Sequence, residues 1–333
     1  MSQKRIILSH PRGDLAIGED EPPVFAAEIG LNHNGDLKTA TEMIRSAAKS
    51  GAHYVKFQAF FAEDLFHPEK TPADLFAIFK RCSLAPEQLY TLKKYCDSEG
   101  IGFAATPFSP AWVAILKDLR VPYLKIASGD LVNPVLVHAA AAADLPLVIS
   151  SGASTYAEIA SCLNYLRNRN FSNFILLYCV SLYPAPPQKI RFSVLLKFMK
   201  DFGCLCGFSD HSAGFWAAPI SVALGARFIE KHFTTDTALP GPDNAISATP
   251  EIFQSLVTHC DIAYGCMREQ SAFPHEEEQR GNTWGRRGMY SGDWRDLEPG
   301  WEKTSNLEEI TNKVEAGELR NTRPDNGRNI RFP

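Results

Sequence analysis

Short apolar runs alternate with amphipathic or Ala-rich stretches from residue 24 onward. The runs are VFAAEIG (24–30), YVKFQAF (54–60), GFAATPF (102–108), YLKIASG (123–129), PLVISSG (146–152), FILLYCV (174–180), LCGFSD (205–210) and RFIEKHFT (227–234). Several of the stretches between them open at Ser, Thr or Asp and close at Gly, as helices do. Eight such units predict an α/β protein of the (β/α)8, or TIM-barrel, type.

An open, doubly wound sheet is the main alternative to a barrel. That fold would need a Gly-rich phosphate-binding turn after an early strand, and GLNHNGD after the first run is not a GxGxxG turn. Residues 61–85 add an extra segment between the second and third runs. Because insertions at the C-terminal rim of a barrel build sites, we predict an active-site loop with a helix here.

Composition divides the chain into four parts. Residues 1–23 form an N-terminal extension, 24–270 the barrel, 271–284 a polar and acidic linker, and 285–333 a small C-terminal appendage. The appendage is too short to bury a core of its own. It is rich in Arg and carries large Trp side chains, so we expect it to dock on a barrel, either its own or that of a second subunit in a homodimer.

Bulk properties exclude several classes of protein. Hydrophobic content of 45% supports a large core, and a net charge of -4 leaves no basic footprint for nucleic acid or for a membrane surface. No apolar run approaches the roughly 20 residues of a spanning helix, and the N-terminus does not read as a signal peptide. Eight scattered cysteines without a CxxC pair indicate buried thiols in a reducing, cytoplasmic setting.

Two histidines, His211 and His232, stand at the ends of successive apolar runs, with one helix-sized segment between them. Neighbouring parallel strands lie ~5 Å apart, so one divalent ion can take both imidazoles. Glu230 shares the strand face of His232, and Asp210 and Asp243 bring carboxylates toward the same rim. Such donors suit Mn2+, Co2+, Zn2+ or Fe2+. The alternative is that each histidine is a hydrogen-bonded rim residue.

Polar residues also occupy strand positions where a barrel interior should be apolar. They are Glu28, Lys56, Gln58, Thr106, Lys125, Ser128, Asp130, Ser150, Ser151, Ser181, Tyr183 and Ser209. An inward-facing lysine must meet a charge or lose its own, and one of the two could pair with Glu28. Lysines, hydroxyls and histidines together at strand C-termini favour a pocket for a phosphorylated anion.

The order of several motifs resembles the bacterial sialic acid synthase family. They are AEIGLNHNGD, GAHYVKFQAF, ATPF, LKIASGD, VISSG, SLYPAPP, GFSDHSAG, IEKHFT and LPGPDNA, within residues 24–250. The resemblance implies a (β/α)8 barrel followed by a small antifreeze-like domain, usually in a domain-swapped dimer. It also implies condensation of phosphoenolpyruvate with an N-acylated hexosamine, such as N-acetylmannosamine or a diacetamido sugar, to a nonulosonic acid.

The same resemblance assigns roles to individual residues. It implies that His211 and His232 hold a divalent ion, commonly Mn2+. It implies a phosphoenolpyruvate cradle made of Lys56, Thr106, Lys125, Ser128, Ser150 and Ser209. It implies that Glu28, Gln58, Tyr183 and Asp243 hold the amino sugar, and that Arg323, in TRPDNG, reaches the sugar's acyl group in a partner subunit.

The chain departs from the family pattern at four points. Asp130 stands where a catalytic Glu is usual, Ser181 takes a phosphate-binding Asn position, and Asn244 replaces a His. We also expect the antifreeze-like segment, 285–333, to be shortened. These departures bear on the sugar preference and on activity more than on the fold.

Asp130 is our candidate to activate the attacking water, with Glu28 or Glu230 shaping the site. Two nearby lysines should lower the pKa of Asp130 and keep it ionised at neutral pH. Two other functions stay open at this point. One is another barrel enzyme, such as a 3-deoxy-aldulosonate synthase or a class II aldolase, and the other is a non-catalytic sugar-phosphate-binding protein.

Overall fold

The computed structural model describes residues 5–268 and, beyond them, 308, 312, 315 and 316. The chain forms two compact units, residues 1–268 and 269–333. Arg323 and nearly all of the predicted linker and appendage lie outside the described residues.

The first unit is a closed barrel of parallel strands, which confirms the predicted fold. The strands are β3 (Val24–Gly30), β4 (Tyr54–Ala59), β5 (Gly102–Pro107), β6 (Leu124–Ile126), β7 (Leu147–Ser150), β8 (Phe174–Cys179), β9 (Leu205–Asp210) and β10 (Phe228–His232). They follow one another in sequence order around the ring, and β10 closes it against β3.

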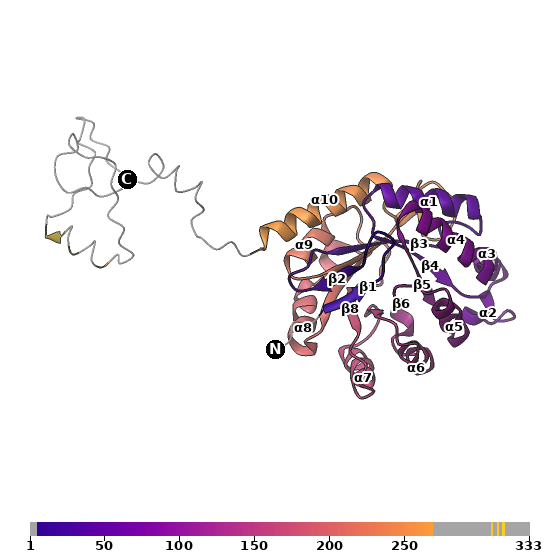
Figure 1. Ribbon diagram of the computed structural model, residues 1–333, viewed down its shortest axis with the longest axis horizontal. Coiled ribbons are helices and arrows are strands. Elements are labelled where there is room, and N and C mark those ends of the chain that lie inside the picture. Colours follow the sequence, from indigo (N-terminus) through magenta and orange to yellow (C-terminus); the bar gives the residue numbers. More distant parts are fainter. Residues whose placement is uncertain (1–4, 269–307, 309–311, 313–314, 317–333) are drawn as a thin grey trace. The chain divides into compact units, whose positions relative to one another are not determined.

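Helices cover the outside of this ring (Figure 1). They are α1 (Leu37–Lys49), α4 (Pro86–Glu99), α5 (Pro110–Asp118), α6 (Pro134–Ala142), α7 (Tyr156–Arg167), α8 (Phe192–Phe202), α9 (Ala217–Ala223) and α10 (Pro250–Cys266). Local signals set their ends. Asp36 caps α1, Thr155 and Glu158 form a capping box on α7, and Gly100 and Gly203 end α4 and α8 in the left-handed region.

The strand interior is built in layers because alternate residues of a strand point to the same side. The lower layers are apolar: Val24, Ala26, Tyr54, Ala104, Tyr123, Val148, Ile175, Leu177, Leu205 and Phe228. The next inward positions toward the C-terminal ends are polar and include Glu28, Lys56, Thr106, Lys125, Ser150, Ser209 and Glu230. The polar pocket therefore stands on a packed apolar floor.

An N-terminal hairpin closes the other end of the barrel. Its strands, β1 (Arg5–Leu8) and β2 (Leu15–Gly18), pair antiparallel. Ile6, Leu8 and Ile17 join the cluster of residues that fills the barrel floor. The sequence predicts this segment only as an N-terminal extension. The alternation of RIIL, with Ile6 and Leu8 buried and its other residues exposed, was the available signal.

The insertion at residues 61–85 contains α2 (Ala62–Leu65) and α3 (Ala73–Cys82), as predicted. Its Phe79 lines the pocket at the strand C-termini. The eight cysteines, all within the described range, are free thiols, and six of them are buried as predicted, whereas Cys204 is partly exposed and Cys266 is exposed.

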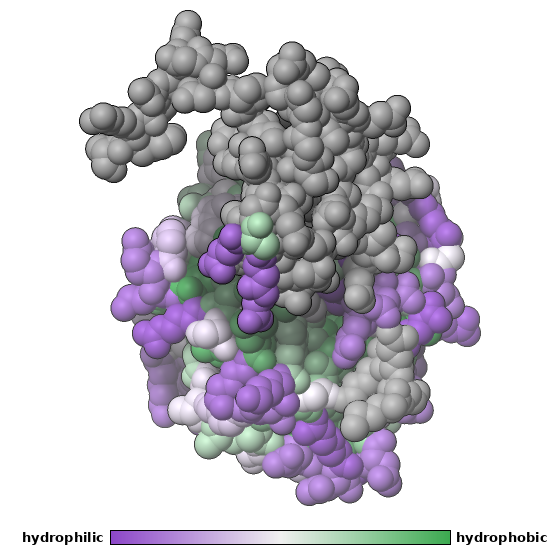
Figure 2. Space-filling view, turned by 90° about the vertical axis from the view of Figure 1, so that its left-hand side faces the viewer, coloured by the Kyte–Doolittle hydropathy of each residue, from purple (hydrophilic) through white to green (hydrophobic). Residues whose placement is uncertain are grey.

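The outer surface is mixed in character. On the face drawn in Figure 2, hydrophilic residues occupy most of the visible periphery and apolar residues show between them. Within the described part of the chain, no helix is both long and apolar enough to cross a membrane.

We predict that the hairpin is a structural part of the barrel. Leu8 is fully buried, so Leu8→Ala should lower the free energy of unfolding by about 2–5 kcal/mol. Ile7, on the opposite face, is 48% exposed, and Ile7→Ala should change it by less than about 0.5 kcal/mol. Urea titration followed by circular dichroism measures both. Equal effects of the two changes would show that the hairpin does not pack on the barrel.

Candidate active site

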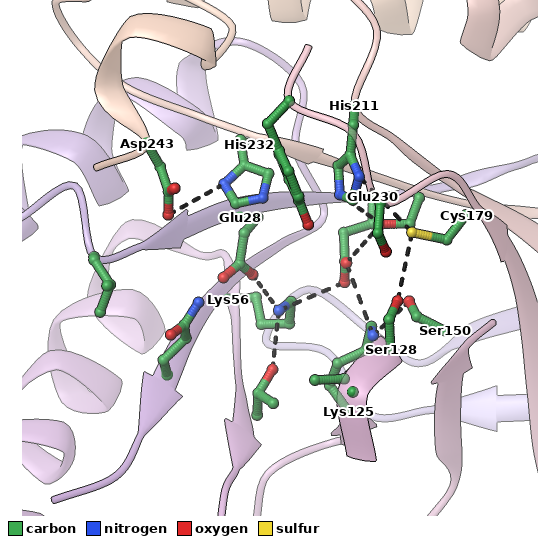
Figure 3. A pocket seen from close by; sticks show the side chains of 18 of the residues that line it. Glu28, Lys56, Lys125, Ser128, Ser150, Cys179, His211, Glu230, His232 and Asp243 are labelled. Carbon is green, nitrogen blue, oxygen red and sulfur yellow. Dashed lines mark hydrogen bonds and ion pairs between the residues drawn. The ribbon is translucent and has the colours of Figure 1, made fainter. Parts of the chain in front are cut away.

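A cavity of about 400 Å³ opens at the C-terminal ends of the barrel strands. It brings together most of the predicted site residues: Glu28, Lys56, Gln58, Thr106, Lys125, Ser128, Ser150, Ser181, Tyr183, Ser209, His211, Glu230, His232 and Asp243. Figure 3 shows how the charged members among them converge. Asp130, Ser151 and Asp210 do not line the cavity, and Ser151 instead donates a hydrogen bond to the Leu177 carbonyl.

Lys56 lies between two buried glutamates (Figure 3). Its Nζ contacts Glu28 Oε2, lies 3.7 Å from Glu230 Oε2 and donates to Thr106 Oγ1 at 3.0 Å. Glu28 and Lys56 are neighbours in the β3–β4 register, which explains their pairing. The charge of Lys56 is therefore balanced within the protein. The pairing of one lysine with Glu28, which the sequence left open, is present.

Lys125 has a different environment. Its Nζ donates to Ser150 Oγ at 2.6 Å and to the Ile126 carbonyl at 2.8 Å, and it lies 4.0 Å from Glu230 Oε1. Burial lowers its pKa, with the charge of Lys56 acting in the same direction. Lys125 has no carboxylate as close as the partners of Lys56, and its hydrogen bonds go to one hydroxyl and one carbonyl, so it is the lysine better placed to meet an external anion.

The two glutamates of the cluster differ in acidity. Burial raises the pKa of Glu28 to about 7, although Lys56 beside it acts in the opposite direction. Burial also opposes ionisation of Glu230, but Lys56, Lys125 and the Ser209 hydroxyl together hold its pKa below the usual range. Glu230 is therefore the permanent counter-charge, whereas Glu28 can exchange a proton near neutral pH.

The two histidines come together as predicted from neighbouring strands. His211 follows β9, His232 ends β10, and their ring centroids lie 5.5 Å apart. His211 Nδ1 donates to the Val180 carbonyl at 2.8 Å, which leaves Nε2 as the acceptor nitrogen. His232 Nδ1 lies 3.9 Å from Asp243 Oδ2 and has no hydrogen-bond partner among the described residues.

The pKa values of the two imidazoles are shifted in opposite directions. Burial, with His211 nearby, holds the pKa of His232 well below its usual value, which keeps the ring neutral. Burial also disfavours the charged form of His211, but Cys179, the Val180 carbonyl and Glu230 outweigh it and raise the pKa.

The residues at this point fit a divalent ion with two nitrogen ligands. Two imidazoles face each other, and the buried Nδ1 of His232 lacks a hydrogen-bond partner within the described part. No group of three or more His, Cys, Asp and Glu side chains among the described residues forms a complete ligand set. Water or substrate oxygens would have to fill the remaining positions.

Asp210 corrects one expectation. The sequence predicts that its carboxylate joins those of the rim, but the carboxylate does not line the pocket and pairs with Lys231 at 3.0 Å. Lys231 Nζ also donates to the Ser212 carbonyl at 2.7 Å, and the Ser212 N–H donates to Asp210 Oδ1 at 2.8 Å. This pair ties the end of β9 to β10 on both sides of His211. Alternation from Ser209 would have predicted the outward direction of Asp210.

Asp130 corrects another expectation. Its carboxylate is half-buried in the turn after β6 and accepts a hydrogen bond from Asn133 Nδ2 at 3.1 Å. The low pKa expected from the lysines is wrong in direction, because burial raises the pKa of Asp130 and outweighs both Asn133 and Lys125.

Asn244 fits its place although a His is usual there. Thr234 Oγ1 donates to Asn244 Oδ1 at 2.6 Å, and Asn244 Nδ2 donates to the Pro240 carbonyl at 2.9 Å. This buried network holds the loop that carries Asp243. The tips of Glu28, Gln58 and Asp243 then gather over Gly30, within 3.6 Å of where a Cβ would stand. The φ of Gly30 is 53°, in the left-handed region.

Cys179 lines the pocket and is not among the site residues predicted from the sequence. Its Sγ lies 3.6 Å from Ser128 Oγ and 3.8 Å from His211 Nδ1 (Figure 3). Burial disfavours its thiolate, but His211 outweighs burial and lowers the pKa of the thiol. Strand periodicity could have predicted its position in the pocket, since Ile175 and Leu177 face inward and Cys179 is the next residue on that side of β8.

A closed (β/α)8 barrel with a charged pocket at its C-terminal face is the architecture of a TIM-barrel enzyme. The chain matches the NeuB family over residues 43–271, and it belongs to that family. It is 37% identical over 267 residues to an uncharacterized protein of Methanocaldococcus jannaschii, covering 80% of this chain and 78% of that protein.

Two named relatives agree with this assignment. The chain is 35% identical over 246 residues to the N,N'-diacetyllegionaminic acid synthase of Legionella pneumophila, covering 69% of each protein. The crystal structure of the N-acetylneuraminic acid synthetase of Leptospira borgpetersenii superposes with a TM-score of 0.77 at 33% identity. That match covers 84% of this chain and 95% of the other.

We predict that the Lys231–Asp210 pair is needed for stability. Lys231→Met leaves Asp210 buried without its partner, so the free energy of unfolding should fall by about 3–5 kcal/mol. Adding Asp210→Asn should recover much of this loss, because the unpaired charge is then removed. Lys197→Met, which removes an exposed pair with Asp201, is the matched control and should cost less than about 1 kcal/mol. Urea titration measures the free energy of unfolding of each variant. A loss in Lys231→Met no greater than that in Lys197→Met would contradict a stabilising role for the Lys231–Asp210 pair.

Proposed function

We propose that this chain is a nonulosonic acid synthase that condenses phosphoenolpyruvate with an N-acyl hexosamine and releases phosphate by C–O cleavage. The observation that carries the proposal is the arrangement of Lys125 and the strand-end hydroxyls beside two convergent histidines. Membership of the NeuB family and the names of its relatives support the same reaction.

Phosphoenolpyruvate would bind on the hydroxyl-rich side of the pocket. The side chains available there are Thr106, Lys125, Ser128, Ser150, Ser181 and Ser209. Lys125 supplies the charge, and Ser150 already accepts its hydrogen bond. Lysine and hydroxyl donors suit phosphate and carboxylate oxygens. Ser181, shorter than the Asn usual at its position, widens this side.

The amino sugar would bind across the pocket, where Glu28, Gln58 and Asp243 gather and Tyr183 lies over His211 with ring centroids 4.2 Å apart. Carboxylate and amide groups accept and donate hydrogen bonds to sugar hydroxyls. His211 and His232 would hold the divalent ion, with Mn2+ our proposal for its identity. When bound, such an ion polarises the aldehyde of the open-chain sugar.

The reaction forms one carbon–carbon bond and breaks one carbon–oxygen bond. C3 of phosphoenolpyruvate attacks the aldehyde carbon, whose oxygen takes up a proton. Water then adds at C2 and loses one proton to a base. Phosphate leaves with the electrons of the C2–O bond, and the remaining proton of the C2 hydroxyl passes to the departing phosphate as the C2 carbonyl forms. Glu28, with a pKa of about 7, suits proton transfer to the new hydroxyl. Asp130 remains our proposed base for the water, although it does not line the cavity; it would act from the turn directly after the lining residues Ser128 and Gly129.

A homodimer belongs to the same proposal. The Arg-rich appendage would dock on a second subunit and bring Arg323 to the acyl group of the sugar. A cytoplasmic location also remains part of this proposal.

The first test of the function is phosphate release from phosphoenolpyruvate over a panel of N-acyl hexosamines with added Mn2+. Lys125→Met removes a charge-assisted contact worth about 1.5–3 kcal/mol, so the KM for phosphoenolpyruvate should rise at least about tenfold, with a smaller effect on the sugar KM. Lys117→Met, exposed on α5, is the control.

Identification of the product separates the candidate functions. A nonulosonic acid supports the proposal, and activity confined to simple aldoses indicates a different barrel enzyme. Absence of turnover with every acceptor would instead favour a binding protein. An unchanged dependence on phosphoenolpyruvate in Lys125→Met would remove this residue from the anion site.

A second prediction concerns Asp130. If it accepts the proton of the attacking water, Asp130→Asn should reduce kcat by about 10²–10⁴-fold. Asp130→Glu, which restores the residue usual in the family, should keep or raise kcat. The Asn variant retains the hydrogen-bonding shape beside Asn133, so circular dichroism should be unchanged. Near-normal kcat in Asp130→Asn would show that this position acts only as a spacer in the turn.

A further inference from the structure

One wall of the pocket is apolar. Leu31, Phe79 and Phe108 line it, and Leu31 is 3% exposed. This wall has no part in binding phosphoenolpyruvate as proposed above. Its side chains offer no hydrogen-bond donor or acceptor, so they can contact only a part of a ligand that needs none.

The wall is held in place by an aromatic cluster. Phe79, from α3 of the insertion, packs against Phe66 and Phe60, with ring centroids 4.7 and 5.9 Å apart. Phe60 also packs edge-on against Phe108 at 5.9 Å. Leu31 belongs to the same small core. Because each ring is fixed by another, the wall is a preformed surface and not a chance exposure of single side chains.

The order of strands places Phe108, at one end of this wall, opposite His211. Phe108 follows β5 and His211 follows β9, and these two strands are four positions apart in the eight-stranded ring. They therefore stand across the mouth of the barrel from each other. If the histidines mark the aldehyde end of the acceptor, its far end points toward Phe79 and Phe108.

Charge at the far end of the acceptor would find no counter-charge in the described part of the pocket. The basic side chains of the described lining are Lys56 and Lys125, with the two histidines. Lys56 is paired with Glu28 and Glu230, and Lys125 lies on the hydroxyl-rich side. A phosphate group against the aromatic wall would lose its hydration without an ionic partner.

We infer that the acceptor is an unphosphorylated acyl-amino hexose whose end remote from the aldehyde carries an apolar group, such as the methyl group of a 6-deoxy sugar. This inference rests on the proposed function. Phe79 is then a specificity-determining residue, and the insertion that carries it selects the sugar.

The test compares three acceptors that share one acyl-amino hexose and differ at C6: methyl, hydroxymethyl or phosphorylated hydroxymethyl. With saturating phosphoenolpyruvate, kcat/KM should favour the methyl over the hydroxymethyl sugar by about tenfold. The phosphorylated sugar should be at least about 100-fold poorer than the methyl sugar. Phe79→Ala should bring the methyl-to-hydroxymethyl ratio close to one, without changing the KM for phosphoenolpyruvate.

Two further variants sharpen the result. Phe79→Lys should raise the relative use of the phosphorylated sugar at least about tenfold, because it places a cation at the wall. Leu75→Ala, on the same helix but exposed and outside the pocket lining, should leave all three ratios unchanged. Should either Phe79 variant lose the circular dichroism of the barrel, Phe108→Leu takes its place in the same comparison.

The outcomes separate this inference from the proposed function. Equal or better use of the phosphorylated sugar by the unaltered protein overturns the inference and leaves the synthase function standing. Ratios that stay unchanged in folded Phe79 variants overturn it in the same way. Absence of phosphate release with every acceptor overturns the proposed function, and the inference falls with it.

Discussion

The site depends on a buried cluster of two lysines and two glutamates that sits on the apolar floor of the barrel. Burying four charges is costly, and the cost is offset only while each charge keeps its partners. Lys56 lies between Glu28 and Glu230, and Glu230 also faces Lys125. Strand register brings these groups together, so the closed barrel is a precondition of the electrostatics. In the same arrangement Lys125 donates to the Ser150 hydroxyl, and burial raises the pKa of Glu28 to about 7.

Around this cluster, the rim residues are positioned by contacts outside the pocket. The Lys231–Asp210 pair braces the strand ends that carry His211 and His232. The Asn244 network holds the loop of Asp243. Both sets of contacts use side chains that do not line the pocket, as is common where loops carry function on a rigid scaffold.

Different types of side chain line different sides of the pocket mouth. Hydroxyls and Lys125 occupy one side, acids and amide groups another, and aromatic rings the wall opposite His211. One cavity can therefore hold a reactant with two anionic groups beside an uncharged one and keep their binding sites separate. Asp130, which accepts a hydrogen bond from Asn133, lies outside the cavity lining, unlike Glu28 and Glu230.

Strand periodicity and the sequence of motifs were enough to predict the barrel, its inward-facing polar residues and the meeting of His211 with His232. These follow from local rules, since alternate residues share a face and consecutive parallel strands are neighbours. Tertiary structure alone decided which glutamate meets which lysine, that Leu8 helps to close the floor, and that Phe79 lies against Phe60 to form an apolar wall. Those contacts join residues far apart in the chain, and their distances depend on register and packing, which no local pattern contains.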